Sequence, residues 1–251
     1  MLFVWYKVSF DEKWSHGSAV CETVYFFVEF VCVFPWKCVS LNNQNREKIM
    51  DGILRKLPIG IQTFEKLREG DYLYVDKTAL VWRIASTETP YFLSRPRRFG
   101  KSLLLSTFEA YFEGKKELFE GLAIADMEKE WKTYPVFHLD LNAEKYDSPQ
   151  ALVEILSRQL TQWELKYGKG EDEETLSGRF AGVIRRACEQ SGRGVVVLVD
   201  EYDKPLLQAL DDGTLLDDYR KTLKAFYGVL KSSDRYLRFV FLTGVTKFAQ
   251  V

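Results

Sequence analysis

PYFLSRPRRFGKSLLLSTFEAY, residues 90–111, contains a short apolar run, a basic turn and a helical pattern in direct succession. The apolar residues 91–93 predict a buried strand. After the turn, apolar side chains recur at spacings of three and four, which predicts one face of a helix. Gly100, Lys101 and Ser102 stand between the two. Strand, loop, Gly-Lys-Ser and helix follow one another in the order of a Walker A motif.

Each residue type in this loop suits phosphate binding. A helix start offers unpaired N–H groups and a partial positive charge, and a glycine lets the backbone approach a phosphate closely. Lys101 would bridge the outer phosphates and the Ser102 hydroxyl would contact Mg²⁺. Arg97 and Arg98 either add positive charge to the site or simply face solvent. The predicted nucleotide contacts are Arg97, Arg98, Phe99, Gly100, Lys101, Ser102 and Leu103.

The loop departs from the GxxxxGK[ST] pattern at one position. The first glycine of that pattern would stand at position 95, where this chain has Arg95 followed by Pro96. A bare Gly-Lys-Ser/Thr triplet should occur by chance in roughly one in ten chains of this length. The assignment therefore needs a second half of the site elsewhere in the chain.

The sequence VVVLVDE, residues 195–201, supplies that second half. An unbroken apolar run of this kind predicts a parallel strand covered on both faces. Asp200 and Glu201 follow at its end, where open α/β sheets place their ligands. In this Walker B pattern Asp200 would hold Mg²⁺, and Glu201 would orient and polarise the attacking water. Two acids pointing into water from a strand end would be the structural alternative.

The spacing of the motifs predicts the sheet class. Lys101 and Asp200 are 99 residues apart, and a further strand at 134–141 lies between them in the sequence. This favours the additional-strand, catalytic-glutamate type of P-loop NTPase, an α/β fold whose mainly parallel sheet is flanked by helices. A strand at 236–242 ends at Thr243, which would sense the γ-phosphate or the lytic water. Thr246 is the competing choice, and for either residue plain strand capping is the structural alternative.

Composition supports one sizeable cytoplasmic domain. The chain has 251 residues, 46% of them hydrophobic, and a formal charge of −1. This gives no general attraction to nucleic acid or to anionic lipid. Four cysteines and two histidines lack the short spacings of a zinc site, so we expect reduced, structurally neutral thiols.

Residues 1–49 differ from the rest. The window 19–36 is the most apolar of the chain, but Glu22 and Glu29 within it oppose membrane insertion. No small-residue cleavage site marks a signal peptide. We expect residues 1–49 to be an upstream extension and residues 50–251 to form the domain.

The remaining patterns predict the helices and strands around the site. Residues 57–86 form either a layer that covers the sheet or a segment that approaches the nucleotide base, and Asp76 or Thr78 would cap the helix that contains Leu80, Val81 and Ile84. The segment 117–131 is expected to be partly helical. Further helices are expected at 64–68, 148–160, 176–190 and 214–231, and a strand at 72–75.

Four segments together resemble the bacterial AAA-ATPase-like family. They are IGIQTFEKLREGDYLYVDKT, FLSRPRRFGKSLLLSTFEAYF, VVVLVDEYDKPL and FVFLTGVTKF, and the similarity covers about residue 55 to the C-terminus. In that family the RPRRFGKS form of the loop is usual, so Arg95 is a family trait. The resemblance assigns Asp203 and Lys204 to a DEYDKP pattern without giving either a step in the reaction.

The resemblance also implies the following about the whole protein. The nucleotide is ATP, and family members often have a PD-(D/E)XK nuclease domain after the ATPase, so a nuclease domain or partner protein beyond the C-terminus is expected. The family's sheet order is 5-1-4-3-2. Strand five, a lid, a sensor 2 arginine and the nuclease domain would all follow Val251, so we expect a partial chain. A homo-oligomer is a further expectation, and no residue is assigned as an arginine finger from a neighbouring copy.

The sequence thus predicts Mg-ATP binding and hydrolysis. Lys101, Glu201 and Thr243 would be the catalytic residues, and Ser102 and Asp200 the metal ligands. Two alternatives stay open: a nucleotide-dependent regulatory switch with little turnover, and a truncated fragment without activity.

Overall fold

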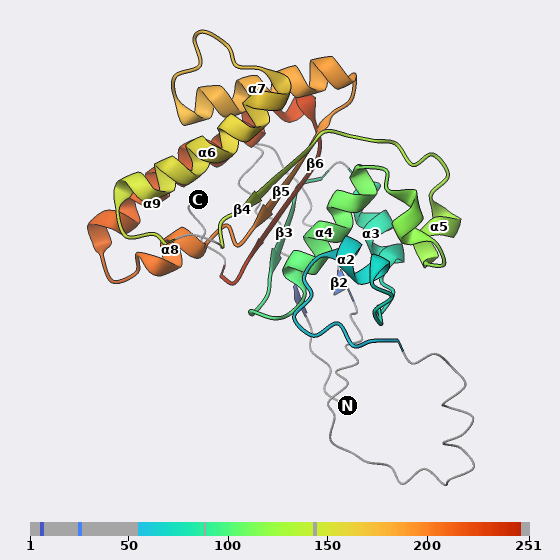
Figure 1. The fold of residues 1–251 in the computed structure, drawn as a ribbon. Coiled ribbons are helices and arrows are strands. Elements are labelled where there is room, and N and C mark those ends of the chain that lie inside the picture. Colours follow the sequence, from blue (N-terminus) through green and yellow to red (C-terminus); the bar gives the residue numbers. More distant parts are fainter. Residues whose placement is uncertain (1–5, 8–24, 27–54, 88, 143–144, 247–251) are drawn as a thin grey trace, which may run out of the picture.

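A four-stranded parallel sheet forms the centre of the molecule (Figure 1). The structure is a computed structural model that describes residues 6–7, 25–26, 55–87, 89–142 and 145–246. The strand order is β3-β6-β5-β4, and every neighbouring pair is parallel. The strands are β3 (Tyr91–Ser94), β4 (Val136–Asp140), β5 (Val195–Asp200) and β6 (Leu237–Gly244). The predicted α/β class with a parallel sheet is confirmed.

The order of these strands agrees with the 1-4-3-2 part of the expected sheet. The strand that separates β3 from β5 is β6, which comes last in the described sequence. The strand predicted at 134–141 exists as β4, but it lies at the far edge of the sheet. A strand therefore does lie between the strands of the two Walker motifs in the sheet, as the additional-strand class requires. That strand is β6, and not β4, which lies between the two motifs in the sequence.

Strand β5 divides the core in two. All six of its residues are buried, as an unbroken apolar run predicts. Val195, Val197 and Val199 pack into one apolar cluster, whereas Val196 and Leu198 pack into the other. Side chains alternate between the two faces of a strand, so both faces of the sheet need a cover of helices.

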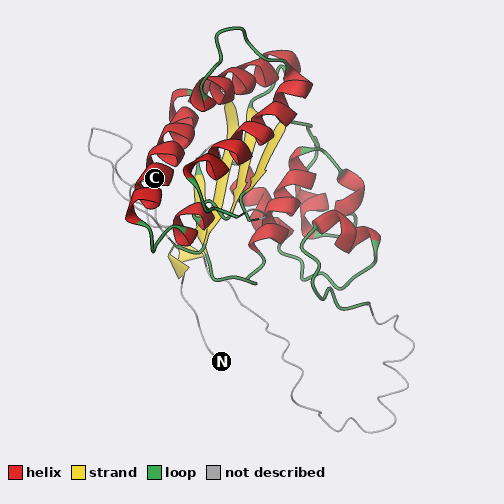
Figure 2. Ribbon diagram, turned by 60° about the vertical axis from the view of Figure 1, so that its left-hand side comes forward, coloured by secondary structure: helices red, strands yellow, loops and turns green. Residues whose placement is uncertain are grey.

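Two helical layers provide this cover (Figures 1 and 2). On one face lie the long helices α6 (Pro149–Tyr167), α7 (Leu176–Ser191) and α9 (Gly213–Ser232). The other face is covered by α4 (Lys101–Phe112), with α2 (Phe64–Glu69) and α3 (Thr78–Ala85) packed against it. The shorter elements are η2 (Lys116–Phe119), α5 (Ala123–Met127), α8 (Lys204–Gln208) and η3 (Asp234–Tyr236).

Local sequence signals explain where the long helices begin. The Ser148 side chain accepts a hydrogen bond from the Ala151 amide, and Pro149 occupies the first turn of α6. Thr175 caps α7 and Asp212 caps α9 in the same way. Each oxygen satisfies an amide that the helix leaves unpaired. The start of α3 is bound by Asp76, whose Oδ1 accepts from both the amide and the hydroxyl of Thr78.

The strand predicted at 72–75 is wrong. This segment makes one isolated bridge, between Tyr72 and Lys56, and then continues without strand structure. Leu73 and Val75 are exposed instead of lying in the core. A short run of aromatic and β-branched residues forms a strand only where a second strand pairs with it, and here no described segment does so beyond the single bridge.

The N-terminal predictions lie mostly outside the described residues. Only β1 (Tyr6–Lys7) and β2 (Tyr25–Phe26) are described in residues 1–49, and they pair antiparallel with each other. The apolar window 19–36 is otherwise not described. None of the helices in the described part of the chain has both the length and the apolar character needed to cross a bilayer.

Candidate functional site

Two segments far apart in the sequence meet at the carboxyl end of the sheet. Ser102 is the second residue of α4, and Asp200 is the last residue of β5. The Ser102 hydroxyl donates a hydrogen bond to Asp200 Oδ2 at 2.5 Å, although the two residues are 98 positions apart. The residue pair predicted to bind a metal is therefore in direct contact.

Lys101 and Glu201 form a second link between the same segments. Lys101 Nζ lies 3.0 Å from Glu201 Oε1, and the lysine side chain is only 3% exposed. The ammonium also donates to the carbonyl oxygens of Arg95 at 3.0 Å and Pro96 at 3.3 Å. A buried ammonium needs such partners because its desolvation is costly. The lysine is thus enclosed by its own loop and by the glutamate.

Thr243 completes this group from the end of β6. Its buried hydroxyl donates to Asp200 Oδ1 at 2.5 Å, and it accepts the amide of Glu201 at 3.3 Å. The competing residue Thr246 contacts Asp203 instead, through its amide and its hydroxyl. Of the two threonines considered, Thr243 is therefore the one in contact with both predicted Walker B acids.

The 95–100 loop contains unusual backbone conformations. Arg98 has φ 67° and Gly100 has φ 75°, both in the left-handed region, and Glu201 across the site has φ 52°. Non-glycine residues adopt this region rarely, and such strain is concentrated at functional sites. A Cβ atom added at Gly100 would meet nothing within 4 Å, so the glycine is required by its φ angle and not by lack of space.

The other predicted contact residues lie in or beside this loop. Arg97, Arg98 and Phe99 are exposed, whereas Leu103 is half-buried in the first turn of α4. Position 95, where the common pattern has glycine, holds a buried arginine. Its backbone N–H donates to Gly244 O at 3.0 Å, which connects the loop to the residue that ends β6. The basic loop is therefore anchored at its start and open to solvent at its middle.

The oxygen atoms of Ser102 and Asp200 at this rim would suit Mg²⁺ better than a transition metal. The described residues contain no group of three or more His, Cys, Asp or Glu side chains that could enclose a metal. Mg²⁺ keeps several waters and is usually bound by one or two carboxylates together with substrate phosphates. One hydroxyl and one carboxylate in contact, Ser102 and Asp200, fit that requirement.

Sequence reasoning gave no role to Asp203, which the structure places against the turn that follows β6. The side chain is fully buried, and its Oδ2 accepts hydrogen bonds from the amides of Val245 and Thr246. The acidic DEYD spacing was visible in the sequence. Its partner turn lies 42 and 43 positions away, which no local pattern could identify.

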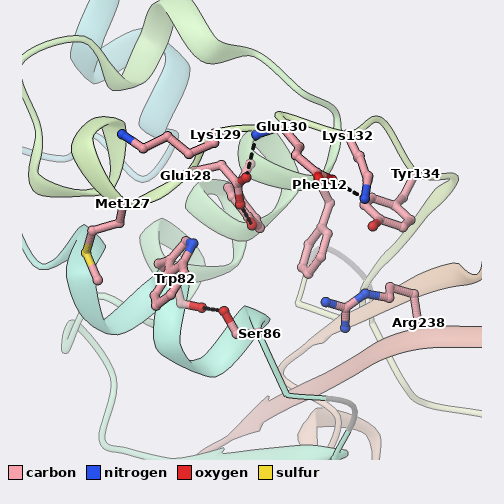
Figure 3. A pocket seen from close by; sticks show the side chains of 11 residues that line it. Trp82, Ser86, Phe112, Met127, Glu128, Lys129, Glu130, Lys132, Tyr134 and Arg238 are labelled. Carbon is pink, nitrogen blue, oxygen red and sulfur yellow. Dashed lines mark hydrogen bonds and ion pairs between the residues drawn. The ribbon is translucent and has the colours of Figure 1, made fainter.

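A pocket of about 350 Å³ lies at the other end of the sheet (Figure 3). It is formed near the amino ends of β4 and β6 and the last turn of α4. Two of its polar side chains have partners: Tyr111 donates to Glu128 at 2.5 Å, and Arg238 donates to the carbonyls of Ala85 and Thr87. Burial and the nearby Glu128 raise the pKa of Tyr111 well above its ordinary value. The lining residues are Trp82, Ser86, Tyr111, Phe112, Met127, Glu128, Lys129, Glu130, Lys132, Tyr134 and Arg238.

The parallel sheet and the Gly-Lys-Ser loop at its carboxyl edge define a P-loop NTPase-like core. Within that class, the chain belongs to the AAA-ATPase-like family, because the family model described as "Predicted AAA-ATPase" matches residues 58–251. The resemblance seen in the sequence is thus confirmed.

One curated relative is a protein of Azotobacter chroococcum mcd 1 described as "Uncharacterized protein in vnfD 5'region". It is 43% identical over 198 residues, which cover 78% of this chain and 38% of the relative. The chain therefore matches well under half of the relative's length. No solved structure matches the chain.

Proposed function

We propose that this chain binds Mg-ATP at the rim formed by the 95–100 loop, Asp200 and Glu201, and hydrolyses it. The observation that carries the proposal is the pair of contacts Ser102–Asp200 at 2.5 Å and Lys101–Glu201 at 3.0 Å. Together they place a hydroxyl, an ammonium and two carboxylates at the start of a helix and the end of a strand. Family membership supports the same activity.

Binding of the phosphates is assigned to the loop and the first turn of α4. The amides of residues 98–102 and the ammonium of Lys101 would hold the β- and γ-phosphates, as in other Walker A loops. The exposed Arg97 and Arg98 can add charge from the rim. Ser102 and Asp200 would hold Mg²⁺, which neutralises charge on the phosphate oxygens when it is bound.

The hydrolytic step is assigned to Glu201 and Thr243. A phosphate that approaches Lys101 competes with Glu201 for the ammonium, because both are anions. Phosphate binding therefore releases the carboxylate to orient the attacking water and accept its proton. Thr243, whose hydroxyl already contacts Asp200 and the Glu201 amide, holds these acids in place. A γ-phosphate contact of Thr243 is part of the same proposal.

The ion pair also favours a second candidate function, a nucleotide-dependent switch. If phosphate replaces Glu201 at Lys101, the 201–203 turn changes partners on binding, whether or not hydrolysis follows. Such a change can be transmitted to a partner or an attached effector when the two states differ in their contacts. Slow turnover with tight binding is the expected signature of this function.

Parallel measurements of binding and turnover separate the two functions. A fluorescent ATP analogue with Mg²⁺ gives the affinity, and released phosphate gives the turnover rate. Tight binding with turnover that Glu201→Gln abolishes identifies an ATPase. Tight binding without turnover in the full-length protein favours a switch. A fluorescence signal that does not change with Mg²⁺ or with the concentration of the ATP analogue refutes both functions.

We extend the proposal to the whole protein on the basis of family membership. Residues 50–251 would form the ATPase domain of a cytoplasmic protein, with ATP preferred over GTP. Partners would be a further copy that supplies an arginine finger, and a nuclease domain or another protein that responds to the nucleotide state. Gel filtration with and without Mg-ATP tests the first of these partners.

A further inference from the structure

Asp203 is a fully buried acid that the proposed reaction does not use. Its Oδ2 atom accepts three hydrogen bonds: from the Val245 amide at 2.9 Å, the Thr246 amide at 2.6 Å and the Thr246 hydroxyl at 2.8 Å. Its Oδ1 atom has no hydrogen-bond partner among the described residues. All of the hydrogen bonds of the Asp203 carboxylate are therefore made by Oδ2 with the 244–246 turn.

The opposite side of this turn is bound by the start of the phosphate loop. The Arg95 amide donates to Gly244 O at 3.0 Å, and the Ser94 hydroxyl donates to Val245 O at 2.9 Å. The peptide groups that join residues 244–245 and 245–246 thus have their N–H on Asp203 and their C=O on residues 94–95. Neither group can rotate without breaking a hydrogen bond on each side.

Packing around Gly244 and Tyr202 leaves the turn little freedom. A Cβ atom at Gly244 would lie 2.6 Å from the Tyr202 ring and 2.8 Å from Asp203 Oδ1, so only glycine fits there. Tyr202 donates through its hydroxyl to Thr246 O at 3.1 Å and through its amide to Thr243 O at 2.9 Å. The 201–203 turn is therefore hydrogen-bonded both to the 244–246 turn and to Thr243.

We propose that Asp203 is a positioning residue that fixes the 244–246 turn between the two halves of the nucleotide site. By holding this turn, it sets the distance from the 95–100 loop, which leads into Lys101 at the start of α4, to the pair Glu201 and Thr243. Carboxylate acceptors form strong hydrogen bonds to amides, and a displacement of about 1 Å in a catalytic group can cost about 100-fold in rate. The inference rests on the proposed ATPase function for its kinetic part only.

The geometry distinguishes a hydrogen-bond role of Asp203 from a charge role. In Asp203→Asn the side-chain oxygen can take the place of Oδ2, and the NH₂ group can take the place of Oδ1, which accepts nothing. Asp203→Ala removes the acceptor altogether. A group that binds metal or transfers a proton would fail in both variants, whereas a positioning acceptor is largely restored by asparagine.

The first experiment needs no nucleotide. Amide hydrogen exchange of Val245 and Thr246 is measured in the full chain for Asp203→Ala, Asp203→Asn and the exposed control Asp211→Ala. We expect exchange to accelerate by about tenfold or more in Asp203→Ala, because the open state becomes easier to reach. Asp203→Asn and Asp211→Ala should stay close to wild type. Unchanged exchange in Asp203→Ala overturns the inference even if the protein proves not to be an ATPase.

The second experiment compares the effect of each Asp203 variant on kcat with its effect on the Kd for the Mg-ATP analogue. Asp203→Ala should lower kcat by about 30-fold or more through misplacement of Glu201 and Thr243, and leave the Kd for the Mg-ATP analogue within about threefold. Equal losses in Asp203→Asn and Asp203→Ala would contradict positioning. Loss of affinity equal to the loss of kcat would do so as well.

Thr246→Val tests the same contact without removing a buried acid. It keeps the shape of the side chain and the amide donor but deletes the hydroxyl donor to Asp203. We expect kcat to fall about three- to tenfold, as loss of one hydrogen bond implies, with Kd unchanged and with recovery in Thr246→Ser. If Asp203→Ala does not fold, this pair decides the question, and a Thr246→Val protein with wild-type kcat overturns the inference.

Discussion

Lys101 Nζ and Glu201 Oε1 lie 3.0 Å apart, which joins the residue after the helix-starting glycine to the residue after the central strand. Both side chains are largely buried, so the ion pair is shielded from solvent. Any phosphate that binds this loop must share or take over the ammonium. Nucleotide binding at Lys101 should therefore weaken the ion pair and let the Glu201 carboxylate move.

Glu201→Gln should separate binding from hydrolysis. Glutamine keeps the size of the side chain but cannot accept a proton, so turnover should fall by about 10²- to 10⁴-fold. The Kd for the Mg-ATP analogue should stay equal or decrease, because the phosphates no longer compete with a carboxylate. Phosphate release and analogue titration measure the two quantities, with the exposed Glu154→Gln as control. A Glu201→Gln protein that turns over ATP normally would remove Glu201 from the mechanism.

Thr243→Val should impair turnover more than binding. The substitution removes the donor to Asp200 Oδ1 and the acceptor for the Glu201 amide, and it leaves the Ser102–Asp200 contact intact. We expect kcat to fall by about tenfold or more, and Kd to change by less than about threefold. Steady-state kinetics against Thr243→Ser, which keeps the hydroxyl, is the measurement. Equal kcat in the valine and serine variants would assign Thr243 to plain packing.

His138 predicts a pH dependence of stability. Burial lowers the pKa of His138, but the Glu109 carboxylate 2.9 Å from Nδ1, together with Asp200 and Asp140, raises it by more, so the net pKa lies above the ordinary value. A raised folded-state pKa stabilises the protein below the unfolded pKa of about 6.5, and this contribution is lost as pH rises through the folded pKa.

The expected outcome is a smaller pH effect in His138→Gln. Urea unfolding at about pH 6 and about pH 8, on either side of the ordinary histidine pKa, gives the loss of stability for each protein. The wild type should lose more stability than His138→Gln between the two values, and Glu109→Gln should resemble the histidine variant. Parallel losses in all three proteins would show that this pair does not contribute.

A buried ion pair between α6 and α7 should dominate the stability of the helical layer. Arg179 donates to both oxygens of Glu164, at 2.8 and 2.7 Å, and both side chains are no more than 10% exposed. Glu164→Ala leaves the buried guanidinium with its hydrogen bonds to Ser157 and Thr161 but without a counter-charge, so the free energy of unfolding should fall by about 3 kcal/mol.

An apolar replacement of both partners is the matched control. Glu164→Leu with Arg179→Met removes both charges together, and it should recover most of the loss. Urea unfolding measures all variants. A Glu164→Ala protein as stable as the double variant would mean that water reaches the pair.

Much of the core was predictable because its signals are local. The apolar run before Asp200, the Gly-Lys-Ser triplet before a helical pattern, and Ser148 before Pro149 each identify an element within a few residues. These elements formed at the predicted places, but α6 runs to Tyr167, seven residues beyond the predicted end at 160. The order of the strands in the sheet followed from the family resemblance, because the residues alone predict parallel strands but not which strands are neighbours.

The errors and omissions arise from long-range effects. The segment 72–75 has residue types typical of a strand but lacks a partner strand, and α8 is a helix of five residues that no periodic pattern could reveal. The contacts of Asp203 depend on a turn more than 40 positions away. Sequence reasoning predicted that Lys101 and Glu201 belong to one site, but the ion pair between them required coordinates.

The most direct test of the central claim is the titration of a fluorescent ATP analogue with Mg²⁺ into wild type, Lys101→Ala and the control Lys221→Ala, whose lysine is exposed on α9. Loss of a charged hydrogen-bond donor to phosphate implies that Lys101→Ala binds about tenfold or more weakly. Lys221→Ala should bind like wild type. Equal binding curves for wild type and Lys101→Ala would contradict the assignment of the 95–100 loop as the phosphate site.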